Sequence, residues 1–165
     1  MLGHMTIPLT QRQATFTNPE LTPSHPIGKS SLRFLLDASH GGAYSVIELR
    51  LAPGFAGPPM LHHHTREEAS FVVLEGRLEI TTGERSRQLG PGDLAHLPPG
   101  VDFVWKNASL ELPARCLCIY APAGFEQMML DISRAFAERP LTPDGAREVM
   151  PGIWRKYGVE MARGR

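Results

Sequence analysis

Hydrophobic and polar positions alternate along this chain over short stretches that are separated by turns. Every second residue from Ala43 to Leu51 falls on one face of a predicted strand, and a strand is also expected at 31–37. Fifteen prolines and sixteen glycines are scattered between such stretches, as in folds built from many short strands. The pattern predicts an antiparallel sandwich or barrel, of which a jelly roll is the closed form. Further strands are expected at 61–64, 70–76, 77–82, 83–89, 94–97, 101–107 and 114–122.

The hydrophobic period changes after Pro122. Within 124–139 the apolar residues recur at helical spacing and form one stripe, and a second amphipathic segment at 149–157 is interrupted by Pro151. We expect both stripes to pack against the barrel or against a second subunit. The chain is therefore divided into an extended N-terminal arm (1–30), a β-barrel (31–122) and a C-terminal helical tail (123–165).

Composition and charge narrow the classes of function. The chain has 165 residues, which suits one domain with a hydrophobic core, and its formal net charge is zero. The sequence contains no block of like charge that would indicate a nucleic-acid-binding face. No apolar run reaches the roughly 20 residues of a membrane span. The N-terminus lacks the pattern of a signal peptide, so a cytoplasmic location is expected.

His62 and His64 are the first candidates for chemistry. Residues two apart on a strand face the same side, with Cα atoms about 6.6 Å apart, so both imidazoles can converge on one metal ion. His63 would point to the opposite face. A third ligand, usually a carboxylate or a histidine, must then come from another strand. The same spacing also fits a solvated strand end at the mouth of the barrel that binds no ion. The spacing alone does not decide between a metal site and such a strand end.

Three segments resemble a known family. Residues 62–76 (HHHTREEASFVVLEG), 89–107 (LGPGDLAHLPPGVDFVWKN) and 123–128 (AGFEQM) resemble the two motifs and the exit strand of the cupins, in particular small single-domain, quercetin-dioxygenase-like cupins of the cupin 2 type. The resemblance covers about 45–127. It implies an all-β double-stranded β-helix, a pocket for a small molecule inside the barrel, and often a homodimer.

The resemblance also implies a set of metal ligands, which this chain matches in part. The family uses two histidines and a glutamate from the first motif and a histidine from the second. His62 and His64 take the first two positions. The glutamate position falls on Ala69 and the last histidine position on Phe103, so half of the usual ligand set is missing.

Three other residues are candidates to replace the missing ligands. Glu68 lies one residue before the family position, and a β-bulge is needed to turn it inward. Glu67 is a further candidate, and either glutamate is a candidate proton acceptor. If His96 faces inward, it forms a three-histidine site with His62 and His64. Such a site accepts a divalent first-row metal ion such as Zn, Fe, Ni or Cu.

Aromatic residues suggest an apolar lining for the pocket. Phe103 and Trp105 share one face of their strand, and Phe71 lies in the strand after the first motif. Together they would bind a planar or hydrophobic small molecule. The alternative is that these residues are ordinary core of the barrel.

Two hypotheses of function result. In the first, the protein is a metal-dependent enzyme, either a dioxygenase-like oxidoreductase or a cyclase or isomerase, that acts on an aromatic, polyphenol-like or polyketide-like substrate. In the second, it is a metal-free binding module or non-metal enzyme, in which the histidines serve as hydrogen-bonding or acid–base groups. The clustering of histidines favours the first, and Ala69 and Phe103 favour the second.

Overall fold

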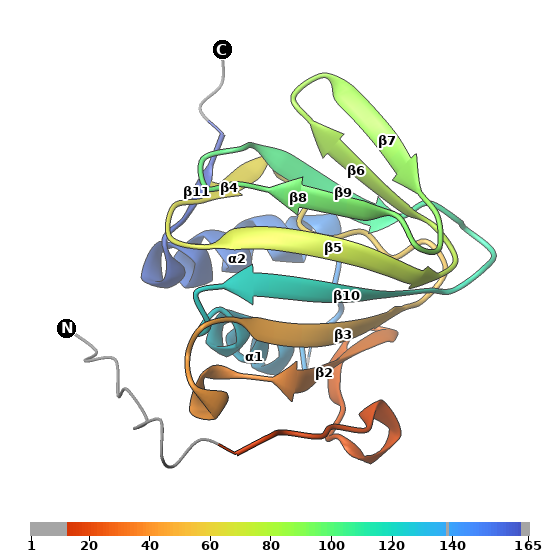
Figure 1. Ribbon diagram of the computed structural model, residues 1–165. Helices are drawn as coiled ribbons and strands as arrows, with labels where there is room; N and C mark the ends of the chain where they lie inside the picture. Colours follow the sequence, from red (N-terminus) through yellow and green to blue (C-terminus); the bar gives the residue numbers. More distant parts are fainter. Residues whose placement is uncertain (1–12, 138, 163–165) are drawn as a thin grey trace.

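Two antiparallel sheets face each other in the computed structural model, which describes residues 13–137 and 139–162 (Figure 1). The predicted all-β barrel with C-terminal helices is confirmed. The first sheet has the order β1 (His25–Ile27), β2 (Ser30–Leu36), β3 (Ser45–Leu51), β10 (Ala114–Ala121), β5 (Glu68–Glu75) and β8 (Leu94–Leu97). The second has the order β11 (Val159–Met161), β4 (His62–His64), β9 (Phe103–Asn107), β6 (Leu78–Thr82) and β7 (Arg85–Leu89).

The core lies between the sheets because the strands alternate between apolar and polar residues. In β5, Ala69, Phe71 and Val73 are buried in the barrel, whereas Glu68 is exposed. The chain leaves β5 through Gly76, which has a φ of +72°. A Cβ atom there would lie 2.5 Å from the carbonyl oxygen of Pro113, so both the conformation and the space require glycine.

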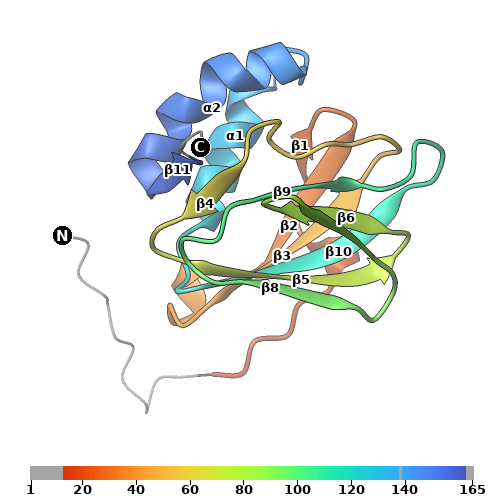
Figure 2. The same ribbon diagram turned by 90° about the horizontal axis from the view of Figure 1, so that it is seen from above.

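The C-terminal tail packs on the barrel of its own chain. Helices α1 (Glu126–Ala135) and α2 (Pro143–Tyr157) lie across one open side of the barrel, beside β4 and β11 (Figure 2). Both apolar stripes predicted from the sequence pack there, although Val149, Ile153 and Tyr157 of the second stripe are only partly buried. The residues that they bring to the core include Met128, Met129, Ile132, Met150 and Trp154.

Helix α2 is longer than the sequence indicated. It begins after Thr142, whose hydroxyl accepts a hydrogen bond of 3.1 Å from the Gly145 N–H, and it ends at Gly158 in the left-handed conformation. Pro151 lies inside the helix and does not interrupt it. Burial of the apolar face against the barrel outweighs the loss of one backbone hydrogen bond.

The arm and the tail both contribute strands to the sheets. Part of the predicted arm forms η2 (Pro19–Leu21) and then β1, which pairs with β2, and a second short 3-10 helix, η3 (Ala38–His40), follows β2. The end of the tail forms β11, which pairs with β4. Residues 1–12 of the arm and 163–165 of the tail lie outside the described residues. Neither α1 nor α2 is long and apolar enough to cross a membrane.

Candidate functional site

Strand β4 turns two of its three histidines into the barrel. His62 and His64 are 3% and 4% exposed, and His63 lies on the outer face, as predicted from the spacing. The strand is held on one side by β11, where Val159 pairs with His64. On the other side His62 pairs with Phe103 of β9. The position of both inner imidazoles therefore depends on the folded tail.

Aromatic rings enclose the two inner imidazoles. His62 lies between Phe103 and Trp154, with ring centroids 4.6 and 4.7 Å away. His64 stacks on Phe125 at 4.4 Å. This burial lowers the pKa of His62 to about 4 and the pKa of His64 to about 3, because a charged ring would lose its hydration. Both side chains are therefore neutral at neutral pH.

Backbone contacts set the tautomer of His62. Its Nδ1 lies 3.0 Å from the carbonyl oxygen of Met60, which accepts a hydrogen bond, so Nδ1 carries the proton. The Nε2 atom of the neutral ring then presents a lone pair. The Nδ1 atom of His64 is buried and has no hydrogen-bond partner within the described part of the chain. The site thus offers hydrogen-bonding atoms in apolar surroundings.

His96 lies on the outer face of the barrel, and the prediction that it faces inward is wrong. Its side chain is 45% exposed. Its Nδ1 atom lies 3.0 Å from Ser70 Oγ, and its Nε2 atom lies 3.7 Å from Glu68 Oε2. In β8 the inward position belongs to Leu97, which is buried. The strand alternation therefore separates His96 from His62 and His64.

Glu68 also points outward, so the β-bulge that would have turned it inward does not form. Pairing between β5 and β8 is regular, with Ala69 opposite Leu97 and Ser70 opposite His96. Ala69 takes the buried position, and the Glu68 side chain is 51% exposed. Glu68 is therefore not a ligand for an ion held by the inner histidines.

Glu67 differs from its neighbour. It is half-buried, and burial raises its pKa. Its Oε2 atom is buried without a hydrogen-bond partner among residues 13–137 and 139–162. Such a carboxyl group holds a proton more readily than an exposed one. Its role as a proton acceptor stays a prediction.

The inner histidines line a cavity of about 70 Å³ inside the barrel. Two of the three aromatic residues predicted for the pocket, Phe103 and Trp105, line it, and so does Trp154 of the tail. Phe71 packs behind them, with its ring centroid 5.5 Å from that of Trp105. The lining is apolar apart from a few side chains, as in many ligand sites.

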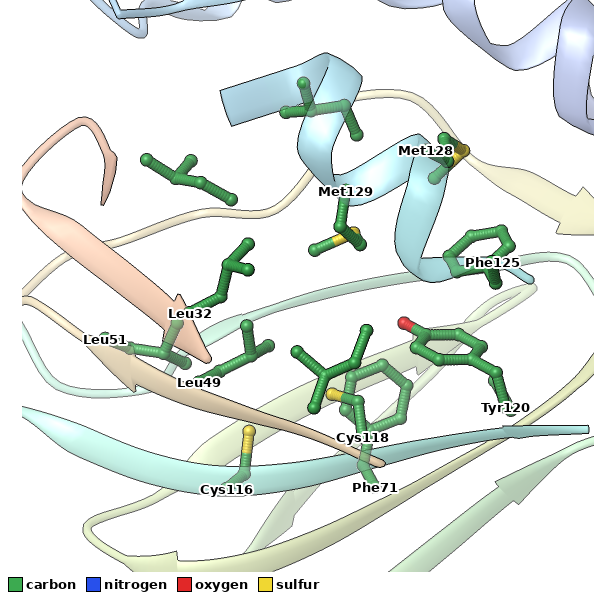
Figure 3. Close-up of a cluster of buried hydrophobic side chains, with 14 of the residues drawn as sticks. Leu32, Leu49, Leu51, Phe71, Cys116, Cys118, Tyr120, Phe125, Met128 and Met129 are labelled. Atoms are coloured by element: carbon green, nitrogen blue, oxygen red, sulfur yellow. The ribbon is translucent and has the colours of Figure 1, made fainter. Parts of the chain in front are cut away.

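Tyr120 is a site residue that the sequence reading missed. It lies on β10 opposite Ala69, is buried, and lines the same cavity. Its ring stacks on Phe125 at 4.2 Å, and its hydroxyl points toward the middle of the buried cluster, below Met129 (Figure 3). Burial raises its pKa well above the usual value, so the hydroxyl keeps its proton and is a hydrogen-bond donor. The alternation Cys116, Cys118, Tyr120 along one strand face was the signal that could have found it.

The residues at the cavity do not fit a metal ion of the predicted kind. Across the described parts of the chain, no group of three or more His, Cys, Asp or Glu side chains comes together in a way that could hold one. The two family positions that lack a ligand are filled by Ala69 and Phe103, which point inward and offer no donor atom. Two imidazoles alone leave the coordination shell of Zn, Fe, Ni or Cu incomplete.

Comparison with known proteins identifies the architecture. The family described as "Cupin domain" matches residues 47–120. KdgF from Halomonas sp. superposes with a TM-score of 0.61 and 16% identity, covering 70% of this chain and 99% of that one. The polyketide cyclase RemF from Streptomyces resistomycificus gives 0.57 and 19%, covering 66% and 80%. A cupin-superfamily sugar phosphate isomerase from Silicibacter pomeroyi gives 0.54 and 22%, covering 63% and 73%. No curated protein matches the sequence.

Proposed function

We propose that this chain, which has the cupin fold and matches the cupin domain over residues 47–120, binds a small molecule through neutral imidazoles and a phenol, without a resident metal ion. One observation carries the proposal. The polar side chains deep in the cavity are His62, His64 and Tyr120, whereas the candidate carboxylate Glu68 and the third histidine, His96, lie on the outer face. The barrel therefore offers hydrogen bonds in apolar surroundings and lacks a full set of metal ligands.

The hydrogen-bonding roles of these residues define what can bind. The lone pair on His62 Nε2 accepts a hydrogen bond, because Nδ1 already donates to Met60. The protonated Tyr120 hydroxyl donates one. A ligand with a hydroxyl group satisfies both, since a hydroxyl donates and accepts. The rest of such a ligand must be apolar to match Phe103 and Trp154.

The same pair supports a second candidate function, acid–base isomerisation or cyclisation. An imidazole lone pair can take a proton from a carbon next to a carbonyl group while the tyrosine hydroxyl gives one to the carbonyl oxygen, which yields an enol. With a pKa of about 4, His62 is a weak base, so this chemistry suits substrates with acidic C–H groups. Turnover of a 1,3-dicarbonyl compound, lost in Tyr120→Phe, is the test.

Metal content separates this proposal from the metal-dependent enzyme predicted from the sequence. Tag-free protein, purified without chelator, is analysed by mass spectrometry for Zn, Fe, Ni and Cu. We expect far less than one equivalent of each, because two imidazoles bind weakly. About one equivalent of a single metal per chain would overturn the proposal in favour of the metal enzyme.

Paired histidine variants supply the control for the metal measurement. The double variant His62→Ala/His64→Ala should keep the low metal content of the wild type and lose about tenfold in affinity for a hydroxyl-bearing ligand. The variant His96→Ala changes the same residue type on the outer face and should alter neither quantity. The homodimer implied by the sequence stays a prediction, which sedimentation can check.

A further inference from the structure

Trp154 brings a buried hydrogen-bond donor to the inner histidines. Its side chain is 1% exposed, and it lines the same cavity as His62 and His64. Its ring stacks on that of His62, with the centroids 4.7 Å apart and an interplanar angle of 28°. The Nε1 atom of Trp154 is buried and has no hydrogen-bond partner among residues 13–137 and 139–162. An indole nitrogen can only donate, and a buried donor without a partner costs free energy that an accepting ligand would recover.

The polar atoms around the cavity offer more donors than acceptors. Trp154 Nε1 and the Tyr120 hydroxyl each carry a proton to donate. His62 Nε2 accepts, because the Nδ1 atom of that ring donates to the carbonyl oxygen of Met60. The neutral ring of His64 has one donor nitrogen and one acceptor nitrogen, so it leaves the balance unchanged. The matching ligand therefore accepts two hydrogen bonds and donates at least one.

A carboxamide group matches this set of atoms. Trp154 Nε1 and His62 Nε2 belong to neighbouring rings, so they need a ligand acceptor and a ligand donor side by side. A carboxamide has its carbonyl oxygen and its N–H group next to each other. The oxygen keeps a second lone pair for the hydroxyl of Tyr120, whose ring contacts that of His64 at 5.9 Å. A hydroxyl group would have to serve the same three partners with a single oxygen atom.

Charge and volume narrow the ligand further. Asp, Glu, Lys and Arg are absent from the described residues that line the cavity. A charged group in such surroundings is costly unless an opposite charge pairs with it, so the ligand group is uncharged. Benzene, with its six-carbon ring, binds in an apolar cavity of about 150 Å³. On that scale the cavity of about 70 Å³ takes about three non-hydrogen atoms, which is a whole small molecule or the end group of a larger one.

We infer that Trp154 determines ligand specificity, and that the ligand presents an uncharged carboxamide group to the inner histidines. The carbonyl oxygen accepts a hydrogen bond from Trp154 Nε1, and the N–H group donates one to His62 Nε2. The inference rests on the proposed function, because a metal ion bound to His62 Nε2 would take the lone pair that receives the N–H group. Helix α2 thereby adds a binding group to the site.

Formamide, acetonitrile and formate test the ligand class at equal size. Formamide has a carbonyl oxygen and an N–H group, acetonitrile has only an acceptor, and formate is charged. The chain has two tryptophans, so the indole N–H signal of Trp154 can be followed in ¹H–¹⁵N spectra. We expect formamide to shift this proton downfield in a saturable way, acetonitrile to bind about tenfold more weakly, and formate to bind more weakly still. No saturable shift with formamide, or equally tight binding of acetonitrile or formate, would overturn the inference.

The variant Trp154→benzothienylalanine isolates the indole N–H. Sulfur replaces the N–H group while the fused rings keep their shape, and an unchanged free energy of unfolding shows that the packing on His62 is kept. Formamide and acetonitrile should both bind about tenfold more weakly, because both accept a hydrogen bond from the indole. The ¹⁵N shift of His62 Nε2 reports binding in this variant. Affinities equal to those of the wild type would overturn the role of Trp154.

The variant His62→Phe removes the acceptor and keeps a ring. Formamide should bind about tenfold more weakly, whereas acetonitrile, which donates no hydrogen bond, should keep its affinity. His96→Phe makes the same change on the outer face and should alter neither affinity. Equal losses of both probes in His62→Phe would contradict donation to Nε2. The two proposals fail separately: about one equivalent of metal overturns the metal-free site whatever the probes do, and wild-type affinities in metal-free Trp154→benzothienylalanine overturn only the role of Trp154.

Discussion

Histidines on the inner face of this barrel have apolar, aromatic surroundings, whereas those on the outer face lie beside carboxylates. His62 and His64 face inward, stack on aromatic rings and are neutral. His63 and His96 face outward and lie beside carboxylates: His63 Nδ1 is 2.8 Å from Asp102 Oδ1, and His96 Nε2 is 3.7 Å from a Glu68 oxygen. The residue type is the same, and the strand face decides its chemistry.

The contrast explains why a chain with family histidines lacks a full ligand set. A metal shell needs imidazoles and an anionic or third neutral donor on the same face. In this barrel the carboxylates that accompany histidines are on the outside, and the inner positions carry Ala69 and Phe103. The inner pair is thereby left as hydrogen-bonding groups in an apolar cavity.

Removing Trp154 should have the largest effect on stability. Its side chain is 1% exposed and covers the His62 ring, so Trp154→Ala should lower the free energy of unfolding by about 3–5 kcal/mol. Water reaching His62 should also raise its pKa toward the ordinary value. Denaturant unfolding and a histidine titration check both effects. Met161→Ala, at a position of β11 that is 50% exposed, is the control, and an equal loss in both variants would contradict the role of Trp154.

Adding the two missing family ligands to the inner face should turn the inner histidine pair into a metal site. The variant Ala69→Glu/Phe103→His places a carboxylate and an imidazole beside the inner pair. We expect it to bind about one equivalent of zinc and, with zinc at a thousandfold its Kd, to gain about 4 kcal/mol of stability. Calorimetric unfolding with and without zinc measures this gain. The control variant Ser70→Glu puts a carboxylate on the outer face, leaves only two imidazoles on the inner face, and should gain much less. Equal gains in both variants would contradict the assignment of faces.

Acid should destabilise the protein through its inner histidines. The folded pKa of His62 is lowered from 6.5 to about 4, so between these values the unfolded chain binds a proton that the folded chain does not. The free energy of unfolding is therefore unaffected by protonation of His62 above about pH 6.5. It falls by about 3 kcal/mol as the pH is lowered from 6.5 through about 4. His62→Gln should remove the contribution of His62 to the pH dependence of the free energy of unfolding. Parallel curves for the variant and the wild type would contradict the lowered pKa.

The outer pair, His96 and Glu68, should contribute least to the free energy of unfolding. The His96 and Glu68 side chains are both about half exposed, so their interaction is screened by water. His96→Ala should change the free energy of unfolding by less than about 1 kcal/mol. Chemical denaturation measures it. A loss comparable to that of Trp154→Ala would mean that the outer face supports the fold far more than its exposure indicates.

Strand alternation made much of this fold predictable from the sequence. The spacing of His62 and His64 requires that they share a face, and the structure places both inside. For His96, alternation fixes only that it shares a face with Leu94, and two apolar residues flank it in β8. The resemblance to the second cupin motif suggested the inner face for His96, whereas the structure exposes Leu94 and His96 and buries Leu97.

Other parts of the site depend on long-range packing. Tyr120 belongs to an apolar exit strand. It becomes part of the candidate site because His64 and Phe125, which are distant in the sequence, lie next to it. Trp154 reaches His62 because α2 folds back across the barrel and β11 pairs with β4. An amphipathic stripe predicts that the tail is buried, and it does not specify which ring it covers.

The protonation state of the inner histidines tests the central claim most directly. Long-range ¹H–¹⁵N spectra of the imidazole rings, recorded on tag-free protein at about pH 5.5, distinguish imidazolium from each neutral tautomer. We predict two neutral rings, with the proton of His62 on Nδ1, and no change on adding one equivalent of zinc. An imidazolium pattern for either ring, or a stoichiometric shift of both with zinc, would contradict a metal-free site with neutral imidazoles.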